Sequence, residues 1–181
     1  MRVLRRVSLL VLVGLVVAAI ALVLGSRPDL EDARDEVDVR WDAIAQPLDE
    51  RYARLEAVVA AARGTPGPSA ELVEELERAI ARWNAARDDA AVADRVAAAN
   101  DLEGLARRFA AVAAASPRLS ADPEVTAALA AYRDAPVPEG AAAFSEAVRR
   151  YEAVRDGPLR AVVATVLGYD EIPTLALPTP A

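Results

Sequence analysis

The sequence contains no cysteine, no histidine and no lysine, so every basic side chain is an arginine. Without cysteine or histidine the chain cannot form disulfides, thiolate nucleophiles, histidine-dependent catalytic triads or the usual zinc sites. Oxygen-ligand metal sites and paired-carboxylate chemistry stay open in principle. The sequence shows neither a glycine-rich phosphate loop nor metal-ligand spacing. We therefore predict a protein that is not an enzyme and that uses no cofactor or metal.

Glycine and aromatic residues are also scarce, with 8 glycines and 4% aromatics in 181 residues. Alanine is abundant instead, at about a quarter of the chain. Alanine is the strongest helix former and adds little bulk to a β core. No alternation typical of strands and no repeat of fixed period is visible. The composition predicts an all-α protein.

Charge is distributed unevenly along the chain. The net charge is −7, and the first 25 residues contain three arginines and no acid, so the remainder carries −10. An acidic domain repels nucleic acid and anionic lipid surfaces. We therefore expect no nucleic-acid partner.

Residues 7–24 form an apolar run of eighteen residues that predicts a transmembrane helix. At 1.5 Å per residue the run would span about 27 Å, close to the thickness of the hydrocarbon layer. Arginines precede it, and an acidic stretch from Asp29 to Glu36 follows it. The positive-inside rule then predicts residues 1–6 in the cytoplasm and the rest outside the cytoplasmic membrane.

The alternative for this run is a cleaved signal peptide. Its apolar region would be about 7–15 residues long and would end in a small-x-small site. The sequence Ala19-Ile20-Ala21 lies inside the run rather than after it. The longer run favours a retained anchor, with the lipid bilayer as its partner.

The next apolar series predicts a helix that restarts after Gly25–Pro28 and is kinked at Pro47. Spacings of three and four place its apolar residues on one face. They are Val37, Trp41, Ile44, Leu48, Tyr52, Leu55, Val59 and Ala62. The run 64–69, rich in glycine and proline, ends this helix.

Further apolar series predict a long helix over about 70–115, with Arg87–Asp89 as a candidate break. A short helix follows from Asp122, then an interruption at 136–140, a helix with Phe144, Val148 and Tyr151 on one face, and a last helix over 159–167. The predicted fold for 25–170 is an elongated antiparallel bundle of three to four helices. Residues 171–181 are predicted to form a flexible tail.

The order of these features resembles the LemA family of bacterial envelope proteins. The shared features are a short basic N-terminus with one apolar span, the pair Arg51-Tyr52, the stretches 100–105 and 115–119, the run 144–151 and the ending 158–169. The resemblance implies a membrane-anchored helical protein with no settled biochemical activity and no catalytic residues. Here, the residues that usually follow Arg-Tyr in the family, an Asp, a Pro and an Asn, are missing.

Four residues are candidates for interaction or structural roles. Arg51 and Tyr52 could anchor a partner, although packing of Tyr52 in a helix seam and pairing of Arg51 with an acid is the favoured interpretation. Asn100, with Asp101 and Glu103, could form a polar site or set register, although a solvated face is favoured. Tyr151 belongs to the LemA-like run 144–151.

Trp41 and Trp83 could form an aromatic platform. Both lie on apolar stripes with helical spacing, which is typical of core residues. Core packing is therefore the favoured interpretation for both.

These observations predict a membrane-anchored helical scaffold or interaction protein of the cell envelope. Its partner would be an envelope protein or a second copy of itself. The alternative is an extracytoplasmic ligand-binding or sensory domain, because helical bundles can hold small ligands between their helices.

Overall fold

The structure is a computed structural model that describes the backbone of residues 2–63, 69–157 and 160–177. Side chains are described in these ranges from Gly25 onward, except those of Ser26, Ser69 and Asp89. The described residues form only helices and connecting segments, which supports the all-α prediction. The helices are α1 (Arg2–Ala62), α2 (Ser69–Asp89), α3 (Val92–Ala115), α4 (Pro117–Ser120), α5 (Pro123–Arg133), α6 (Ala141–Arg155) and α7 (Arg160–Leu167).

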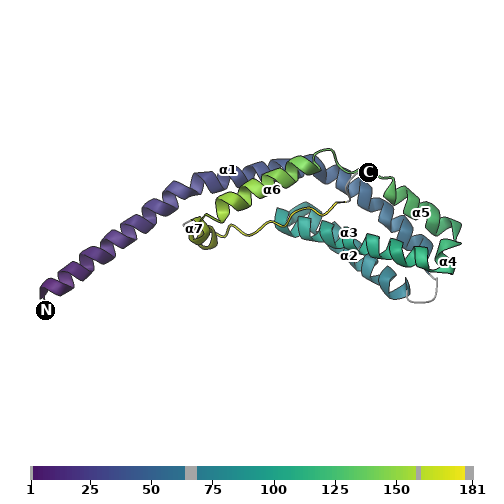
Figure 1. Ribbon diagram of the computed structural model, residues 1–181, viewed down its shortest axis with the longest axis horizontal. Coiled ribbons are helices and arrows are strands. Elements are labelled where there is room, and N and C mark those ends of the chain that lie inside the picture. The colour runs from purple at the N-terminus through teal and green to yellow at the C-terminus, as the bar shows by residue number, and fades with distance from the viewer. Residues whose placement is uncertain (1, 64–68, 158–159, 178–181) are drawn as a thin grey trace.

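Helix α1 is the spine of an elongated bundle (Figure 1). Helices α2 and α3 form a hairpin along one side of its C-terminal half. Helices α5 and α6 follow one another in the opposite direction to α1, and α7 lies at the end where α1 leaves the bundle. The chain then turns back, and its last segment runs beside α6 and α3 (Figure 1).

The core follows the predicted apolar stripes closely. All eight predicted residues of the α1 stripe are buried, from Val37 to Ala62. The matching faces of α2, α5 and α6 are buried as well, which confirms the helix periodicity read from the sequence. The face of α3 contributes several small residues, so α2 and α3 can approach closely. Its buried apolar residues are Val92, Val96, Ala99, Leu102, Ala106, Phe109 and Ala113.

The predicted helix restart at Gly25–Pro28 is wrong. Helix α1 continues without interruption through both Pro28 and Pro47. A proline removes one backbone donor from a helix, and at Pro28, which is exposed, water can solvate the freed carbonyl group. At Pro47 the packed stripe on both sides of the proline, from Ile44 and Leu48 outward, holds the helix together.

The predicted helix over 70–115 is two helices. The chain breaks between Asp89 and Val92, next to the candidate break at Arg87–Asp89, and reverses direction. The side chain of Arg95 donates to the carbonyl oxygen of Ala90 at 2.7 Å, which satisfies a backbone group freed at the turn. The result is an antiparallel hairpin rather than one long rod.

Residues 171–177, the described part of the predicted tail, contain no helix but pack on the bundle. Helix α7 ends at Leu167, and Gly168 has a φ of +75°, a backbone conformation that glycine adopts without strain. After Gly168 the chain packs on the bundle, where Ile172 is 2% exposed and belongs to the main core. Residues 178–181 lie outside the described part of the chain.

Within the ranges whose side chains are described, no helix combines the length and apolarity needed to cross a membrane. The predicted span at 7–24 has its side chains outside those ranges.

Candidate functional sites: a buried ion pair and a bound C-terminal segment

Arg51 and Glu103 form an ion pair in the interior of the bundle. Their side chains are 3% and 1% exposed, and Arg51 Nε donates to Glu103 Oε1 at 2.8 Å. Arg51 comes from α1 and Glu103 from α3, so the pair joins the spine to the hairpin. A solvated face is therefore the wrong interpretation for Glu103.

The Nη1 group of Arg51 reaches the end of α5. Its Nη1 donates to the carbonyl oxygen of Ala135 at 2.9 Å and lies 3.4 Å from that of Tyr132. The guanidinium carbon also lies 4.4 Å from the centre of the Tyr132 ring, in cation–π geometry. We call Arg51, Glu103 and Tyr132 the polar cluster, which links α1, α3 and α5.

Burial alters the acid–base properties of this region. Burial, the largest cause, would lower the pKa of Arg51, but its hydrogen bond to Glu103 and the nearby Tyr132 and Glu103 charges together outweigh burial, so the pKa lies above its usual value. Burial and the negative charge of Glu103 raise the pKa values of Tyr52 and Tyr132 well above that of a free tyrosine. Both hydroxyl groups are buried without a hydrogen-bond partner among the described residues.

The two tryptophans pack in the core beside this cluster. Trp41 lies 6.3 Å from Trp83 and 5.4 Å from Phe144, measured between ring centres, and Tyr52 meets Trp83 edge-on at 4.9 Å. Trp83 Nε1 donates to Asp49 at 2.9 Å. Trp41 and Trp83 are 1% and 2% exposed, so they form no open aromatic platform.

The other two predicted residues, Asn100 and Tyr151, both contact the chain that follows α7. They hold residues 169–177, which we call the C-terminal segment. Tyr151 on α6 donates its hydroxyl to the carbonyl oxygen of Asp170 at 2.8 Å. The Asn100 amide on α3 donates to the carbonyl oxygen of Thr174 at 2.9 Å and accepts from the N–H of Ala176 at 2.7 Å.

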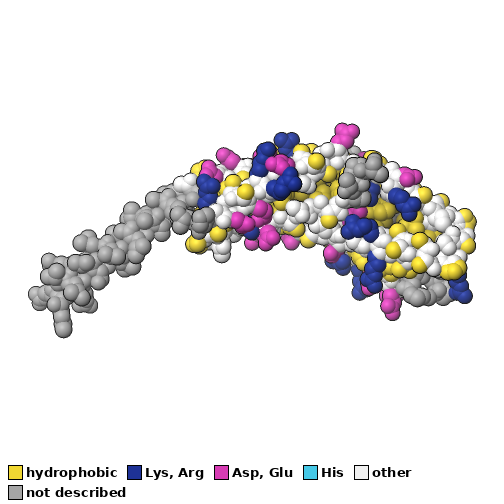
Figure 2. Space-filling model, viewed as in Figure 1, with side chains coloured by type: hydrophobic (Ala, Val, Ile, Leu, Met, Phe, Trp, Pro, Cys, Tyr) yellow, Lys and Arg dark blue, Asp and Glu magenta, His cyan; other side chains and the backbone are white. Residues whose placement is uncertain are grey.

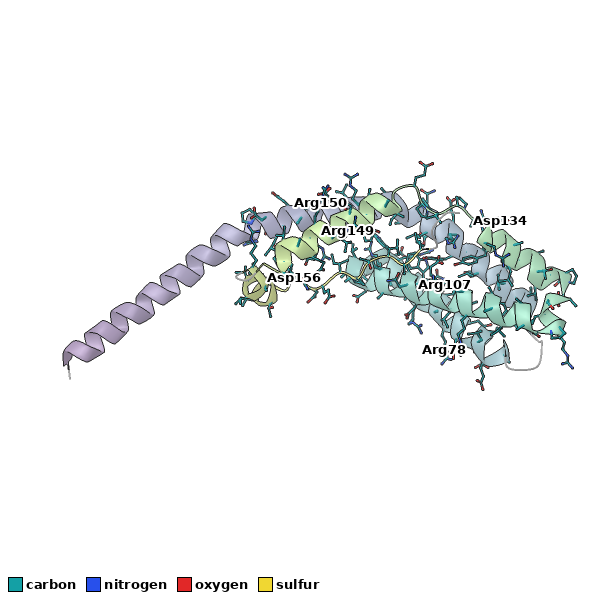
Figure 3. All side chains as sticks on the ribbon, viewed as in Figure 1. Arg78, Arg107, Asp134, Arg149, Arg150 and Asp156 are labelled. Atoms are coloured by element: carbon teal, nitrogen blue, oxygen red, sulfur yellow. The ribbon has the colours of Figure 1, made fainter. Side chains whose placement is uncertain are left out.

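Two residues that sequence reasoning missed complete this set of contacts. Glu152 on α6 accepts the N–H of Ile172 at 2.8 Å, and it is oriented by Arg155 at 3.0 Å. Burial raises the pKa of Glu152 although both of these contacts oppose the shift. Arg107 on α3 donates to the carbonyl oxygen of Ala176 at 3.2 Å (Figure 3). In the sequence, only helical spacing connects Arg107 with the candidate Asn100, because it places Arg107 two turns later on the same face of the helix.

A cavity of about 580 Å³ lies beside the end of the C-terminal segment. It is formed by the connection between α5 and α6, the start of α6, and two leucines of the segment. Its lining includes Arg133, Val137, Pro138, Ser145, Leu175 and Leu177. Among the described residues no group of acidic side chains gathers in a way that could hold a metal ion.

The face of the bundle seen in Figure 2 carries both signs of charge interspersed. Most of its ion pairs are exposed, and exposed pairs contribute little to stability. The polar cluster, in contrast, is closed to solvent and offers no access to a substrate. Its geometry therefore fits a structural role.

The chain matches no model of a known protein family, and a search of curated protein sequences finds no similar protein. The resemblance to LemA proteins stays a prediction.

Proposed function

We propose that this protein is a membrane-anchored helical scaffold or interaction protein, similar to LemA proteins, with its bundle on the outer side of the cytoplasmic membrane. The observation that carries this proposal is the continuity of α1. The 61-residue helix includes the apolar run 7–24 and is also the spine of the bundle. If residues 7–24 span the bilayer, the helix projects about 57 Å beyond it.

The charge pattern supports the orientation in this proposal. Arg2, Arg5 and Arg6 precede the apolar run, and the bundle after it is acidic. A rigid helix joined directly to a span would hold the bundle surface at a fixed distance from the membrane.

Site-specific photo-crosslinking in native membranes tests the interaction function. The full chain would carry a photoreactive residue at one exposed position at a time, on α1 at Val39, on α2 at Arg78 and on α4 at Ser120. We expect one face to give an adduct of a single reproducible mass, while the others give none. A chain that stays monomeric and forms no adduct from any face would contradict the proposal.

The second candidate function is ligand binding, and the cavity of about 580 Å³ favours it. Its volume lies within the range of about 300–1,000 Å³ typical of small-molecule sites. A thermal-shift screen of small molecules tests this function. A ligand that raises the unfolding temperature of the wild type, but not of a Ser145→Trp variant that fills the cavity, would support it. A screen without any such ligand would exclude it.

A further inference from the structure

The C-terminal segment is bound as a peptide ligand would be. Tyr169 N–H bonds the carbonyl oxygen of Ala164 in α7, and the exposed Glu171 carboxylate lies 3.9 Å from Arg155. From Asp170 onward, the segment's hydrogen bonds to the bundle involve only its backbone, at Asp170, Ile172, Thr174 and Ala176. These are alternate residues, and in an extended chain the N–H and C=O groups of alternate residues face the same edge. One edge of the segment is therefore recognised along its length by side chains of α6 and α3.

Recognition through the backbone does not depend on the identity of the bound side chains. The Asn100 amide both donates to and accepts from the segment, as a neighbouring strand would. Pro173 is out of phase with the bonded residues, so its missing N–H removes none of these bonds. The same groups could hold a different extended segment.

Specificity in this groove comes from apolar side chains. Ile172 is 2% exposed and packs in the main core, and Leu175 and Leu177 are half-buried against it. Leu175 and Leu177 also line the cavity of about 580 Å³. A ligand would need one aliphatic anchor with further aliphatic side chains three and five positions later.

The segment can leave without breaking a helix. It contains no helical residue, it follows α7 and Gly168, and a few side chains and apolar contacts hold it. Terminal segments of this kind open locally at a lower free energy than the core helices do.

We propose that the groove between α3 and α6 is a binding site for an extended, aliphatic peptide segment of a partner protein, and that residues 169–177 occupy it in cis. The proposal gives the scaffold function a specific site, but it does not depend on the anchor. Peptide binding can be measured whether or not residues 7–24 span a membrane, so the two proposals can fail separately.

The test uses the full chain in detergent and a fluorescent peptide with the sequence of residues 169–177. In the wild type the cis segment competes at an effective concentration on the order of millimolar, so peptide binding is weak. Ile172→Asp in the full chain should expel the cis segment because a carboxylate is costly to bury. We expect this variant to bind the unaltered peptide at least about tenfold more tightly than the wild type does.

Adding Asn100→Ala to the Ile172→Asp variant removes both bonds of the amide and should weaken peptide binding by about tenfold or more. Asn84→Ala, on the exposed face of α2, is the matched control. Added to the same Ile172→Asp variant, it should leave the affinity for the peptide unchanged. If Ile172→Asp reduces the helical content, Ile172→Ala in the full chain replaces it as a milder change.

Three results would overturn the proposal. One is the absence of saturable peptide binding to a fully helical Ile172→Asp or Ile172→Ala variant. Another is peptide binding that Asn100→Ala leaves unchanged. The third is a wild-type dimer that Asn100→Ala dissociates, because the occupant would then be the C-terminal segment of a second copy.

Discussion

Arg51 is the residue on which three helices converge. Its charge is balanced by Glu103, and its Nη1 group donates to backbone oxygens at the end of α5. A buried ion pair contributes little net stability compared with a well-packed apolar pair, but breaking it leaves an unpaired charge in the interior. Replacing one partner of the pair should therefore cost far more stability than replacing both partners together.

We expect Glu103→Ala to destabilise the chain by about 3–5 kcal/mol, because it leaves the Arg51 charge buried without its partner. The double variant Arg51→Met with Glu103→Leu should recover most of that loss, since no charge remains. Urea unfolding, monitored by circular dichroism, measures the unfolding free energy of the single and the double variant. A cost below about 1 kcal/mol for Glu103→Ala would show that water enters the cluster.

Tyr52 and Tyr132 give a second prediction at the scale of residues, concerning alkaline pH. In the folded chain their pKa values are raised, chiefly by burial, whereas in the unfolded chain they are about 10. Above pH 10 the unfolded chain therefore binds fewer protons than the folded one, and stability falls as pH rises. The slope is up to about 1.4 kcal/mol per pH unit for each tyrosine.

Replacing both tyrosines by phenylalanine should flatten this decline. At pH 7 the change should cost little, because neither hydroxyl has a hydrogen-bond partner among the described residues. Chemical unfolding at a series of pH values from 7 to about 12 compares the two proteins. Identical alkaline profiles for wild type and double variant would contradict the assigned burial.

At the scale of elements, the helices were predictable because apolar residues recur at spacings of three and four on each. The points at which helices end or continue were harder to predict. A proline predicts the loss of one hydrogen bond, but neighbouring core contacts decide whether the helix continues, as they do at Pro47. The C-terminal segment had no signal, because its partners are single side chains on distant helices.

The start of α6 packs on α1 through Gly140. A Cβ atom there would lie 2.8 Å from Cγ2 of Ile44, a β-branched and therefore stiff side chain. We expect Gly140→Ala to cost about 1–3 kcal/mol by overpacking. Gly104→Ala in α3 is the control, because a Cβ meets nothing within 4 Å there, and it should stabilise the helix by about 0.5–1 kcal/mol. Thermal unfolding of both variants measures the difference, and equal effects would contradict this packing.

At the scale of the whole molecule, the candidate site residues divide into two pairs. Arg51 and Tyr52 lie in the interior, where helical periodicity placed Tyr52 and where an acid was expected beside Arg51. Asn100 and Tyr151 lie at the groove, which no pattern in the sequence indicated, because extended segments bound by side chains have no periodic signature. The partner acid itself could have been found, since Glu103 lies four residues after Ala99 and three before Ala106 on the buried face of α3.

We propose that α1 crosses the membrane as the same helix that forms the spine of the bundle. The absence of native cysteine allows a direct measurement, because a single introduced cysteine is the only thiol in the chain. Val3→Cys lies before the apolar run, and Ser120→Cys lies on the exposed end of the bundle. A membrane-impermeant maleimide would be applied to intact cells and, in parallel, to lysed cells.

We predict that Ser120→Cys is labelled in intact cells, that Val3→Cys is labelled only after lysis, and that the protein stays in carbonate-washed membranes at its full mass of 19.1 kDa. A shortened protein released from the membrane, or the opposite labelling pattern, would contradict the account.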